Sequence, residues 1–526
     1  MLFATSSSEV VILPMHCDLC PMGLKSALLS PIARLTTQRL ESDLRQAVLK
    51  QKQIFDKLIV TGRKTEFGKH HNFSQIQTHH DFCKQVPIRD YESLRPYIER
   101  IKEGRSDILW PGRPRYFAKT SGTTSGVKYI PITTASIPNH IASARNALFN
   151  YYTQTGNGRF FDGKMIFLSG SPTLEETGGI PTGRLSGIVN HLVPGWIRQS
   201  QMPSHTVNCI EDWEEKVDRI VEETIHSDMR LISGIPPWVQ MYYEKLLDAS
   251  GKSSITDLFP NFSVFVHGGV NYAPYAAKLE SLVGTSIDTL ETYPASEGFI
   301  AYQDRWPFEG LRLNVNSGIF FEFVPLDQMG SANPDRLTLE QVEIDRDYAL
   351  IINNNAGLWA YNIGDTIRFV SVDPPRIVVS GRIKHFISAF GEHVIAKEVD
   401  QSMAEACALT GASVVEFTVA PQVSPMDGET PYHEWFIEFS NHPEDMKAFS
   451  NALEWSMLQQ NTYYKDLIDG KILGPLQITK IENGGFRSYM HSIGKLGGQN
   501  KVARLMNDRS VVDLLGAYIT GHSPEA

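Results

Sequence analysis

Cysteine is scarce in this chain of 526 residues, and the five cysteines that it has are scattered along it. So few cysteines exclude a disulfide framework. Cys17 and Cys20 form a lone C-x-x-C, and zinc would need two further ligands at a similar spacing, but the sequence has no second C-x-x-C. His16 would add one ligand and still leave the site short. Metal binding or redox use of this motif is therefore the weaker alternative.

A long apolar run and an excess of positive charge are also missing. Without 18 consecutive apolar residues there is no transmembrane helix, and Val10–Leu13 is too short for the apolar region of a signal peptide. We therefore expect a soluble cytoplasmic protein with no membrane partner. The 49 Lys+Arg and 59 Asp+Glu give a net charge of −10, which argues against a nucleic-acid partner.

The apolar residues predict a parallel sheet in the first half of the chain. Its length suggests two to four domains, and a hydrophobic share of 42% is typical of a globular protein. Short apolar strands alternate with amphipathic helices, as in a doubly wound sheet that binds ligands beyond the carboxyl ends of its strands. The expected strands are 164–170, 230–234, 261–270 and 286–294, and the expected helices are 236–251 and 273–284.

Other segments predict a helical start, a hairpin-rich middle and a separate tail. Residues 37–60 have helical spacing, with Thr37 as the expected N-cap. The tail from about residue 390 reads as an α+β domain of about 140 residues. Its elements are a helix near 396–408, two strands, and one long helix from Pro443 to about Leu467. The expected hairpin strands are 318–326, 349–354, 366–371 and 376–387.

The strongest local signal is a run of six Ser, Thr and Gly residues, 121–126, followed by Lys128. Small residues let backbone N–H groups approach phosphate oxygens, the hydroxyls add donors, and the lysine adds charge. The run lacks the Walker pattern, so a P-loop NTPase is not indicated. Composition alone leaves phosphate binding and a flexible Ser/Gly loop both open.

Two further clusters follow. In Glu291–Gly298, at the end of a predicted strand, a carboxylate is suited to Mg²⁺ and a tyrosine ring to stacking on a base. In Tyr361–Asp365, which we expect in a tight turn, the aspartate is suited to two ribose hydroxyls. The alternatives are a turn with a solvated glutamate for the first cluster and an ordinary hairpin turn for the second.

Two clusters near the end of the chain combine glycines with cations. They are Ser380–Lys384 and the run Gly494–Arg504. Glycines beside lysines suit a mobile loop that carries charge into a site. In isolation, a solvated basic loop is the better interpretation of either cluster.

The order of these clusters is more specific than any one of them. A Ser/Thr/Gly loop, Y-x-x-S-E, Y-x-x-G-D, G-R-x-K and a late lysine in a glycine-rich loop resemble the adenylate-forming superfamily of acyl-CoA ligases, firefly luciferase and peptide-synthetase adenylation domains. The wording SGTTSGVKYIPIT, YPASEG and YNIGD resembles, more specifically, the auxin-responsive acyl-acid amido synthetases (the Gretchen Hagen three family), in a bacterial-type version. The resemblance covers about residues 28–505.

This resemblance implies an α/β fold with two domains. The large N-terminal domain, 28–380, would have doubly wound mixed sheets plus a β-rich subregion, and would bind ATP and the acyl substrate. The smaller, mobile α+β C-terminal domain, 381–526, would turn about a hinge near 382–384 that includes Lys384. Residues 1–27 would be an N-terminal extension of unknown role.

The resemblance also assigns roles to single residues. Glu297 would hold Mg²⁺, Asp365 and Arg382 would contact the ribose, and Lys501 would lie near the α-phosphate. Two departures stand out: Asn362 replaces the usual arginine of Y-R-x-G-D, and Ala503 replaces the usual proline of the tail motif. The remaining nucleotide-binding residues would be Ser121, Gly122, Thr123, Thr124, Ser125, Gly126 and Lys128 at the phosphates, Gly268, Gly269 and Tyr293 at the adenine, and Ser296.

The implied reaction uses ATP and Mg²⁺ and has two small-molecule substrates. A carboxylic acid attacks the α-phosphorus of ATP, and an amine, expected to be an amino acid, then takes the acyl group and releases AMP. The alternatives are transfer to a thiol such as CoA and, further off, a catalytically lapsed nucleotide-binding protein. His267 is a possible base for the amine, although a packed structural histidine is the favoured interpretation.

The Ser/Thr/Gly run generates a first prediction. Thr124→Ala and Ser125→Ala should each weaken ATP use, because each removes a donor to a charged oxygen, an interaction worth about 1.5–3 kcal/mol. ATP–pyrophosphate exchange measures the effect. Unchanged exchange in both variants would contradict phosphate binding by this run.

Overall fold

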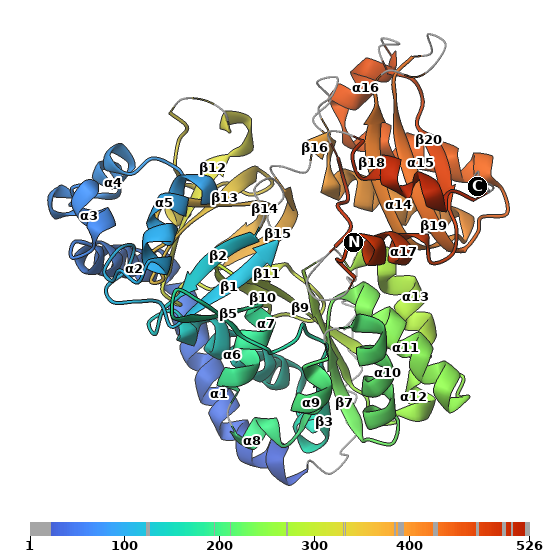
Figure 1. Cartoon of the computed structure of the whole chain (residues 1–526), viewed down its shortest axis with the longest axis horizontal. Coiled ribbons are helices and arrows are strands. Elements are labelled where there is room, and N and C mark those ends of the chain that lie inside the picture. The colour runs from blue at the N-terminus through green and yellow to red at the C-terminus, as the bar shows by residue number, and fades with distance from the viewer. Residues whose placement is uncertain are drawn as a thin grey trace, which may run out of the picture.

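A computed structural model describes residues 23–520 apart from 122–126, 194, 211, 270–271, 330, 332, 383–385, 388–393, 424, 426–429, 470–472, 497–500 and 507–508. The N-terminal part, blue to yellow in Figure 1, contains the large sheet, and the C-terminal part, orange to red, stands beside one end of it. Within the described residues, no helix is long and apolar enough to span a membrane.

One mixed sheet of eleven strands forms the centre of the N-terminal part. Five strands, β9, β8, β7, β3 and β6, are parallel, and the rest pair antiparallel. The predicted parallel sheet is therefore confirmed, and the predicted hairpins extend the same sheet. In spatial order the strands are β12 (Ile319–Pro325), β13 (Asp347–Asn354), β14 (Tyr361–Val372), β15 (Pro375–Arg382), β11 (Leu311–Leu313), β10 (Gly298–Gln303), β9 (Asp288–Ala295), β8 (Val264–Gly268), β7 (Met229–Ser233), β3 (Lys164–Phe167) and β6 (Gln201–Met202).

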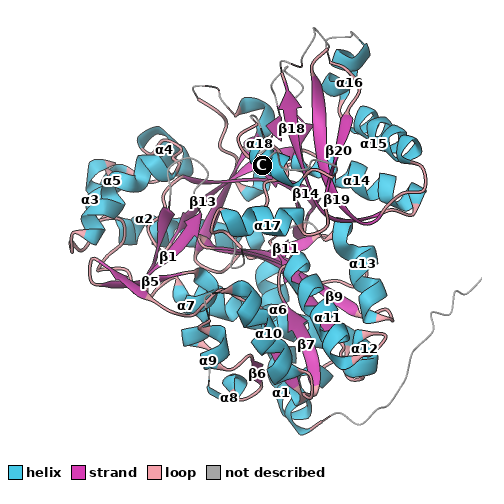
Figure 2. Ribbon diagram, turned by 45° about the vertical axis from the view of Figure 1, so that its right-hand side comes forward, coloured by secondary structure: helices cyan, strands magenta, loops and turns pink. Residues whose placement is uncertain are grey.

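Helices cover both faces of the parallel half, which makes it doubly wound. Successive residues of a strand point to opposite faces, and so Leu231 and Ile232 of β7 lie in different cores. The helices on the Leu231 side are α1 (Leu24–Arg45) and α6 (Ile137–Thr155), and those on the Ile232 side are α10 (Trp213–Thr224), α11 (Pro236–Ser250) and α13 (Ala273–Val283). Figure 2 shows α10, α11 and α13 beside β7 and β9.

The turn chemistry at the end of α11 is as the sequence predicts. Pro236 begins the helix, and Gly251 ends it with a φ of +65°, a left-handed conformation that glycine adopts without strain. A smaller sheet and the remaining N-terminal helices complete this part of the molecule. These elements are β2 (Val127–Ile132), β1 (Tyr116–Ser121), β5 (Ile180–Gly183) and β4 (Glu175–Thr177), with α2 (Ala47–Gly62), α3 (Glu66–His70), α4 (His79–Gln85), α5 (Tyr91–Lys102), α7 (Leu185–Leu192), α8 (Gly195–Arg198), α9 (His205–Asn208) and α12 (Ile255–Leu258).

The C-terminal part has its own sheet and its own core, in which Trp435 is completely buried. The predicted fold class is confirmed: the chain is an α/β protein with a large N-terminal mixed-sheet domain and a smaller C-terminal α+β domain. The C-terminal elements are β18 (Ser413–Gln422), β19 (Tyr432–Asn441), β20 (Gln477–Ile481), the short pair β16 (Phe386–Ile387) and β17 (Val394–Ile395), and the helices α14 (Ala396–Thr410), α15 (Met446–Gln460), α16 (Thr462–Asp469), α17 (Gly485–Ser492) and α18 (Val512–Leu515).

Two local helix predictions were wrong. Thr37 is no N-cap, because it lies inside α1, where its hydroxyl hydrogen-bonds that of Thr153 on α6 at 3.2 Å. The helix expected from Pro443 to Leu467 is two helices, because Asn461 adopts an extended conformation between α15 and α16. Its side chain then accepts a hydrogen bond from the backbone N–H of Tyr464.

The turn expected at Tyr361–Asp365 was also wrong, since these residues form the first part of β14. Tyr361 and Asn362 pair with Ile352 and Ile351 of β13. Gly364 has a φ of +87°, and the pairing shifts register nearby, so this stretch is an irregular strand. Its glycine marks a bulge in the sheet, which explains why the motif resembles a turn.

A completely buried glutamate, Glu322, lies on β12 in the core of the antiparallel half. It is paired with Arg336 (2.9 and 2.8 Å), Asn353 (2.8 Å) and His79 (2.7 Å). Burial alone would raise its pKa, but the charge of Arg336 and the hydrogen bonds overcome that effect and lower the pKa to about 2. Cys83, His79 and Glu322 bring ligand atoms within 4.8 Å of one another. Arg336 already neutralises the carboxylate, so this cluster is a structural ion pair.

This ion pair generates a second prediction. Glu322→Gln leaves the buried Arg336 without its counter-ion, and we expect a loss of about 3–5 kcal/mol in the free energy of unfolding, measured by urea titration. Asp327→Asn, which breaks the exposed pair of Asp327 with Arg346, should leave the urea midpoint unchanged. Because the pKa of Glu322 is lowered, this stabilisation is present above about pH 4.5 and is lost as the pH falls towards 2. Equal midpoints for the two variants would contradict the role of the buried pair.

Candidate functional site

The Ser/Thr/Gly run connects the two strands of a hairpin. β1 and β2 pair antiparallel, with Thr120 opposite Lys128 and Ser121 opposite Val127. Gly122, Thr123, Thr124, Ser125 and Gly126 lie outside the described residues, as does the side chain of Ser121. The two strands thus fix both ends of the run.

Two tyrosines, Tyr91 and Tyr361, lie between the hairpin and the turn of residues 296–297 that joins β9 to β10. The ammonium of Lys128 lies 5.9 Å from the ring centroid of Tyr91, and the Tyr91 hydroxyl accepts from the backbone N–H of Tyr129. Tyr361 hydrogen-bonds the carboxylate of Glu297. Burial, together with the charge of Glu297, raises the pKa of Tyr361 well above its usual value, so its hydroxyl keeps its proton and donates it.

The backbone around Glu297 is fixed by Asn354, whose side-chain amide donates to the carbonyl of Glu297 at 2.8 Å. Ser296 beside it is buried, whereas Glu297 is half-buried. A half-buried carboxylate with a fixed backbone supplies the hard oxygen ligand that Mg²⁺ prefers.

The next contact joins the two halves of the large sheet. The hydroxyl of Tyr293, on β9, donates a hydrogen bond to the buried carboxyl of Asp365, on β14. Three strands separate β9 from β14 in the sheet order, so a flat sheet would hold them about 19 Å apart. The hydrogen bond therefore requires the antiparallel half to curl back towards β9.

Of the two predicted residues after this contact, the structure places the backbone of Arg382 and does not describe Lys384. In the backbone register, Arg382 of β15 pairs with Asp365 of β14. The side chain of Arg382 and the whole of Lys384 lie outside the described residues.

The C-terminal part contributes Lys501 to the same region. Gly268 ends β8, and a Cβ atom there would collide with the carbonyl oxygen of Thr292, the residue before Tyr293. Gly269 has a φ of +82°, and a Cβ atom on it would lie 3.1 Å from Nζ of Lys501. Glycine at position 268 thus lets β8 lie close to the backbone of Thr292, and glycine at position 269 leaves room for the ammonium of Lys501.

Arg504 holds the segment that carries Lys501. Its guanidinium forms ion pairs with Asp400 (3.0 Å) and Glu416, and donates to the hydroxyl of Tyr275 on α13 at 3.2 Å. The neighbouring Ala503 accepts from the Thr418 hydroxyl at 2.6 Å. Because Tyr275 belongs to the N-terminal part, Arg504 links the two parts close to Lys501.

His267 is packed, which agrees with the structural interpretation. Its ring is buried and stacks on Tyr272 with centroids 4.4 Å apart. Burial lowers its pKa to about 4, so the ring is neutral at physiological pH.

Sequence reasoning missed the individual roles of Glu291 and Tyr361, although both belong to motifs that it singled out. Glu291 lies two residues before Tyr293 on the same face of β9, and burial raises its pKa to about 7. The sequence shows that Glu291 belongs to the motif, but its burial follows only from the folded structure.

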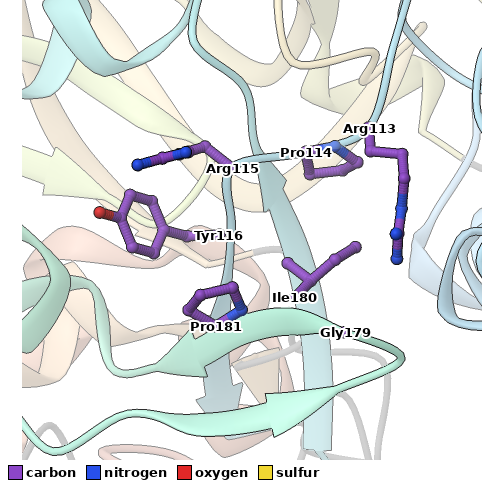
Figure 3. Close-up of a pocket in the computed structure, with 7 residues that line it drawn as sticks. All are labelled: Arg113, Pro114, Arg115, Tyr116, Gly179, Ile180 and Pro181. Carbon is purple, nitrogen blue, oxygen red and sulfur yellow. The ribbon is translucent and has the colours of Figure 1, made fainter.

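A surface cavity of about 270 Å³ lies apart from these residues. Arg113, Arg115, Tyr116 and Pro181 are among the residues that line it, at the start of β1, and Figure 3 shows the two arginines on either side of Pro114. The Ser/Thr/Gly run follows the other end of β1, about 17–20 Å along the strand. The cavity is therefore not part of the region around Tyr293 and Lys501.

Comparison with protein families identifies the chain. It matches the GH3 family N-terminal domain over residues 36–192 and 184–287, the GH3 family central domain over 313–382, and the GH3 family C-terminal domain over 397–510. These matches span most of the sequence, and the chain belongs to the GH3 family.

Characterised relatives are distant but similar over their whole length. The chain is 22% identical to the indole-3-acetic acid-amido synthetase GH3.3 of Arabidopsis thaliana, covering 95% of this chain and 97% of the relative. It is 22% identical to the jasmonoyl–L-amino acid synthetase JAR4 of Nicotiana attenuata, covering 89% and 93%.

Solved structures share the fold. The GH3.15 acyl acid amido synthetase superposes with a TM-score of 0.76 at 18% identity, covering 92% of this chain and 96% of the other. A 2-hydroxyisobutyryl-CoA ligase in its postadenylation state superposes with a TM-score of 0.55 at 12% identity, covering 91% of each chain. The two-domain architecture is thus shared with adenylate-forming enzymes.

The Tyr293–Asp365 hydrogen bond generates a third prediction. Tyr293→Phe removes the donor that orients the buried carboxyl, and we expect ATP affinity, measured by calorimetry, to fall about tenfold or more. The control is Tyr302→Phe on β10, whose buried hydroxyl has no hydrogen-bond partner among the described residues. A normal ATP affinity in Tyr293→Phe, or equal losses of affinity in both variants, would contradict a role of Asp365 in ATP binding.

Proposed function

We propose that the protein is an ATP-dependent acyl-acid amido synthetase. It adenylates a carboxylic acid, releasing pyrophosphate, and transfers the acyl group to an amine, an amino acid. Membership of the GH3 family and similarity to two amino acid-conjugating synthetases support this activity. The wording of its motifs supports a bacterial-type member.

One observation carries the proposal: Lys501, from the C-terminal part, reaches Gly269 at the carboxyl end of β8. Parallel sheets bind ligands at this edge of the strands. Tyr293 and Asp365 lie at the same edge, because Gly268 pairs with Thr292 directly before Tyr293. A cation that the C-terminal domain brings to this edge can stabilise the α-phosphate during adenylation, the one step in which that phosphate is attacked.

The remaining roles follow the order of the residues around this edge. We assign the ribose to Asp365 and Arg382, and the adenine to the backbone of Gly268 and Gly269 and the ring of Tyr293. Glu297 would hold Mg²⁺, which when bound neutralises phosphate charge. The phosphates would be held by Lys128 and the run Ser121, Gly122, Thr123, Thr124, Ser125 and Gly126, with Ser296 completing the nucleotide-binding set.

In the first step, a carboxylate oxygen attacks the α-phosphorus of ATP and pyrophosphate leaves. Lys501 stabilises the charge that builds on the α-phosphate. In the second step, the amine nitrogen attacks the acyl carbonyl carbon and AMP leaves. We propose that residues 381–526 rotate between the steps about a hinge at 382–384, relative to 28–380, and that 1–27 form an extension.

Transfer to a thiol is the second candidate, because the fold also matches a 2-hydroxyisobutyryl-CoA ligase. ATP–pyrophosphate exchange with a panel of carboxylic acids tests adenylation for both candidates. The mass of the product, formed with amino acids or with CoA, distinguishes an amide from a thioester. The absence of acid-dependent exchange would refute both and favour a lapsed nucleotide-binding protein.

Lys501 generates a fourth prediction. Lys501→Ala should lower ATP–pyrophosphate exchange by about 10²–10³-fold, because it removes a preorganised cation from the charge-building step. Conversion of a supplied acyl-adenylate and amine should stay nearly normal, since that step no longer needs the cation. The matched control is Lys495→Ala, which removes an exposed lysine of the same glycine-rich segment.

Normal exchange in Lys501→Ala would show that Lys501 is not the adenylation lysine. An equal loss of rate in the conversion of a supplied acyl-adenylate by Lys501→Ala would also show that Lys501 is not the adenylation lysine. Loss of exchange in Lys495→Ala instead would transfer the role to Lys495.

A further inference from the structure

Arg184 is a half-buried cation that has no counter-ion among the residues that the structure describes. It lies directly after β5, at the start of α7, and burial lowers its pKa. Within the described part of the chain, its guanidinium makes no hydrogen bond and no ion pair. Its nitrogen atoms are not enclosed by protein, so a ligand can reach them.

A second cation, Lys216 of α10, lies close enough to Arg184 for the arginine to influence its titration. Its side chain is buried, and Nζ donates to the carbonyl oxygens of Ser169 (3.0 Å) and Asn208 (2.7 Å). No carboxylate among the described residues forms an ion pair with it. One buried and one half-buried cation that lack a carboxylate partner among the described residues favour the binding of an anion beside them.

The beginning of α7 adds donors beside Arg184. The first N–H groups of a helix have no partner within the helix, and here the side chain of the N-cap residue, Arg184, does not satisfy them. The hydroxyl of Ser186, in the first turn, is buried and has no partner among the described residues. Arg184, Lys216 and the start of α7 thus bring groups that favour negative charge to the loop after β3.

This position borders the candidate functional site. The loop after β3 touches both cations: a Cβ atom at Gly170 would lie 2.7 Å from Cδ of Arg184, and Ser169 accepts from Lys216. β3 is two strands from β8 in the sheet order, which places the loop about 10 Å from Gly268–Gly269. On α10, Val217 packs with Trp238 and with Leu496, from the segment that precedes Lys501.

We propose that Arg184 and Lys216 form a carboxylate subsite that binds the α-carboxylate of the acceptor amino acid. This inference rests on the proposed amido synthetase function. The reacting carboxylate of the acyl acid belongs beside Lys501, where the α-phosphate is assigned, and so the second anion is left to the acceptor. Holding its α-carboxylate about two strand spacings from the adenine-binding glycines directs its amine towards the acyl carbonyl.

The transfer step balances with this arrangement. The amine nitrogen forms a bond to the acyl carbon, the bond from that carbon to the AMP oxygen breaks, and AMP leaves with the electron pair. The acceptor enters as a zwitterion, so its ammonium group gives up two protons to solvent in total. Arg184 and Lys216 bind and orient the acceptor throughout and exchange no proton with it.

The test compares a free amino acid with its methyl ester in the full-length enzyme. The acyl acid is the one that supports the fastest pyrophosphate exchange, and the acceptor is the best of the twenty amino acids. Arg184→Gln should raise the KM for the free amino acid about 10–100-fold, because a hydrogen-bonded charge pair is lost. The KM for the methyl ester, and pyrophosphate exchange, should not change. Arg184→Lys should restore part of the affinity for the free amino acid.

Arg198→Gln is the matched control, because Arg198 is exposed on α8 and its partners among the described residues are the backbone carbonyls of His191 and Val193. It should match the wild type in every assay. Equal losses for acid and ester, or no loss for either, would overturn the subsite. Reduced exchange would assign Arg184 to the ATP phosphates, and a raised KM for the acyl acid would assign it to that substrate. A wild-type enzyme without acid-dependent exchange would refute the proposed function itself, whatever the Arg184 variants do.

Discussion

The hydrogen bond from Tyr293 to Asp365 is the contact on which the arrangement of the site depends. It joins β9, the last parallel strand, to β14, which is four positions away in the same sheet. Such a contact exists only if the antiparallel half of the sheet curls. That curl brings the β14–β15 pair to the carboxyl ends of β8 and β9, where the proposed nucleotide site lies. The large buried core inside the antiparallel half, which includes the Glu322–Arg336 pair, keeps this shape.

The second constraint is the link between the two domains. Arg504 is held by two carboxylates of the C-terminal domain, Asp400 and Glu416, and by one hydroxyl of the N-terminal domain, that of Tyr275. Across the boundary Arg504 has one uncharged partner, Tyr275, whereas within the C-terminal domain it forms ion pairs with two carboxylates. If the contacts of Tyr275 broke, these two ion pairs would still hold the segment that carries Lys501, as the proposed domain rotation requires.

Much of the fold was predictable because its signals are local. Short apolar strands that alternate with amphipathic helices predicted the parallel half, and Gly251 ended its helix as expected. Thr37 and Tyr361–Asp365 were misjudged because tertiary contacts decided them: a neighbouring helix for Thr37, and pairing with β13 for the motif. The order of the motifs indicated the proposed nucleotide site, but the sequence could not show that Lys501 would meet Gly269. Arg184 and Lys216 are 32 residues apart and the sequence assigns neither of them to a site, so only the folded chain reveals them together.

In the proposed reaction, the carboxylate of the acyl acid attacks the α-phosphorus of ATP. The direct test of this attack is to label both carboxylate oxygens with ¹⁸O and to measure the masses of the products by mass spectrometry. We expect one labelled oxygen to leave with AMP, because the carboxylate oxygen stays on phosphorus when the amine takes the acyl carbon. Label in inorganic phosphate together with ADP, or unlabelled AMP, would contradict it.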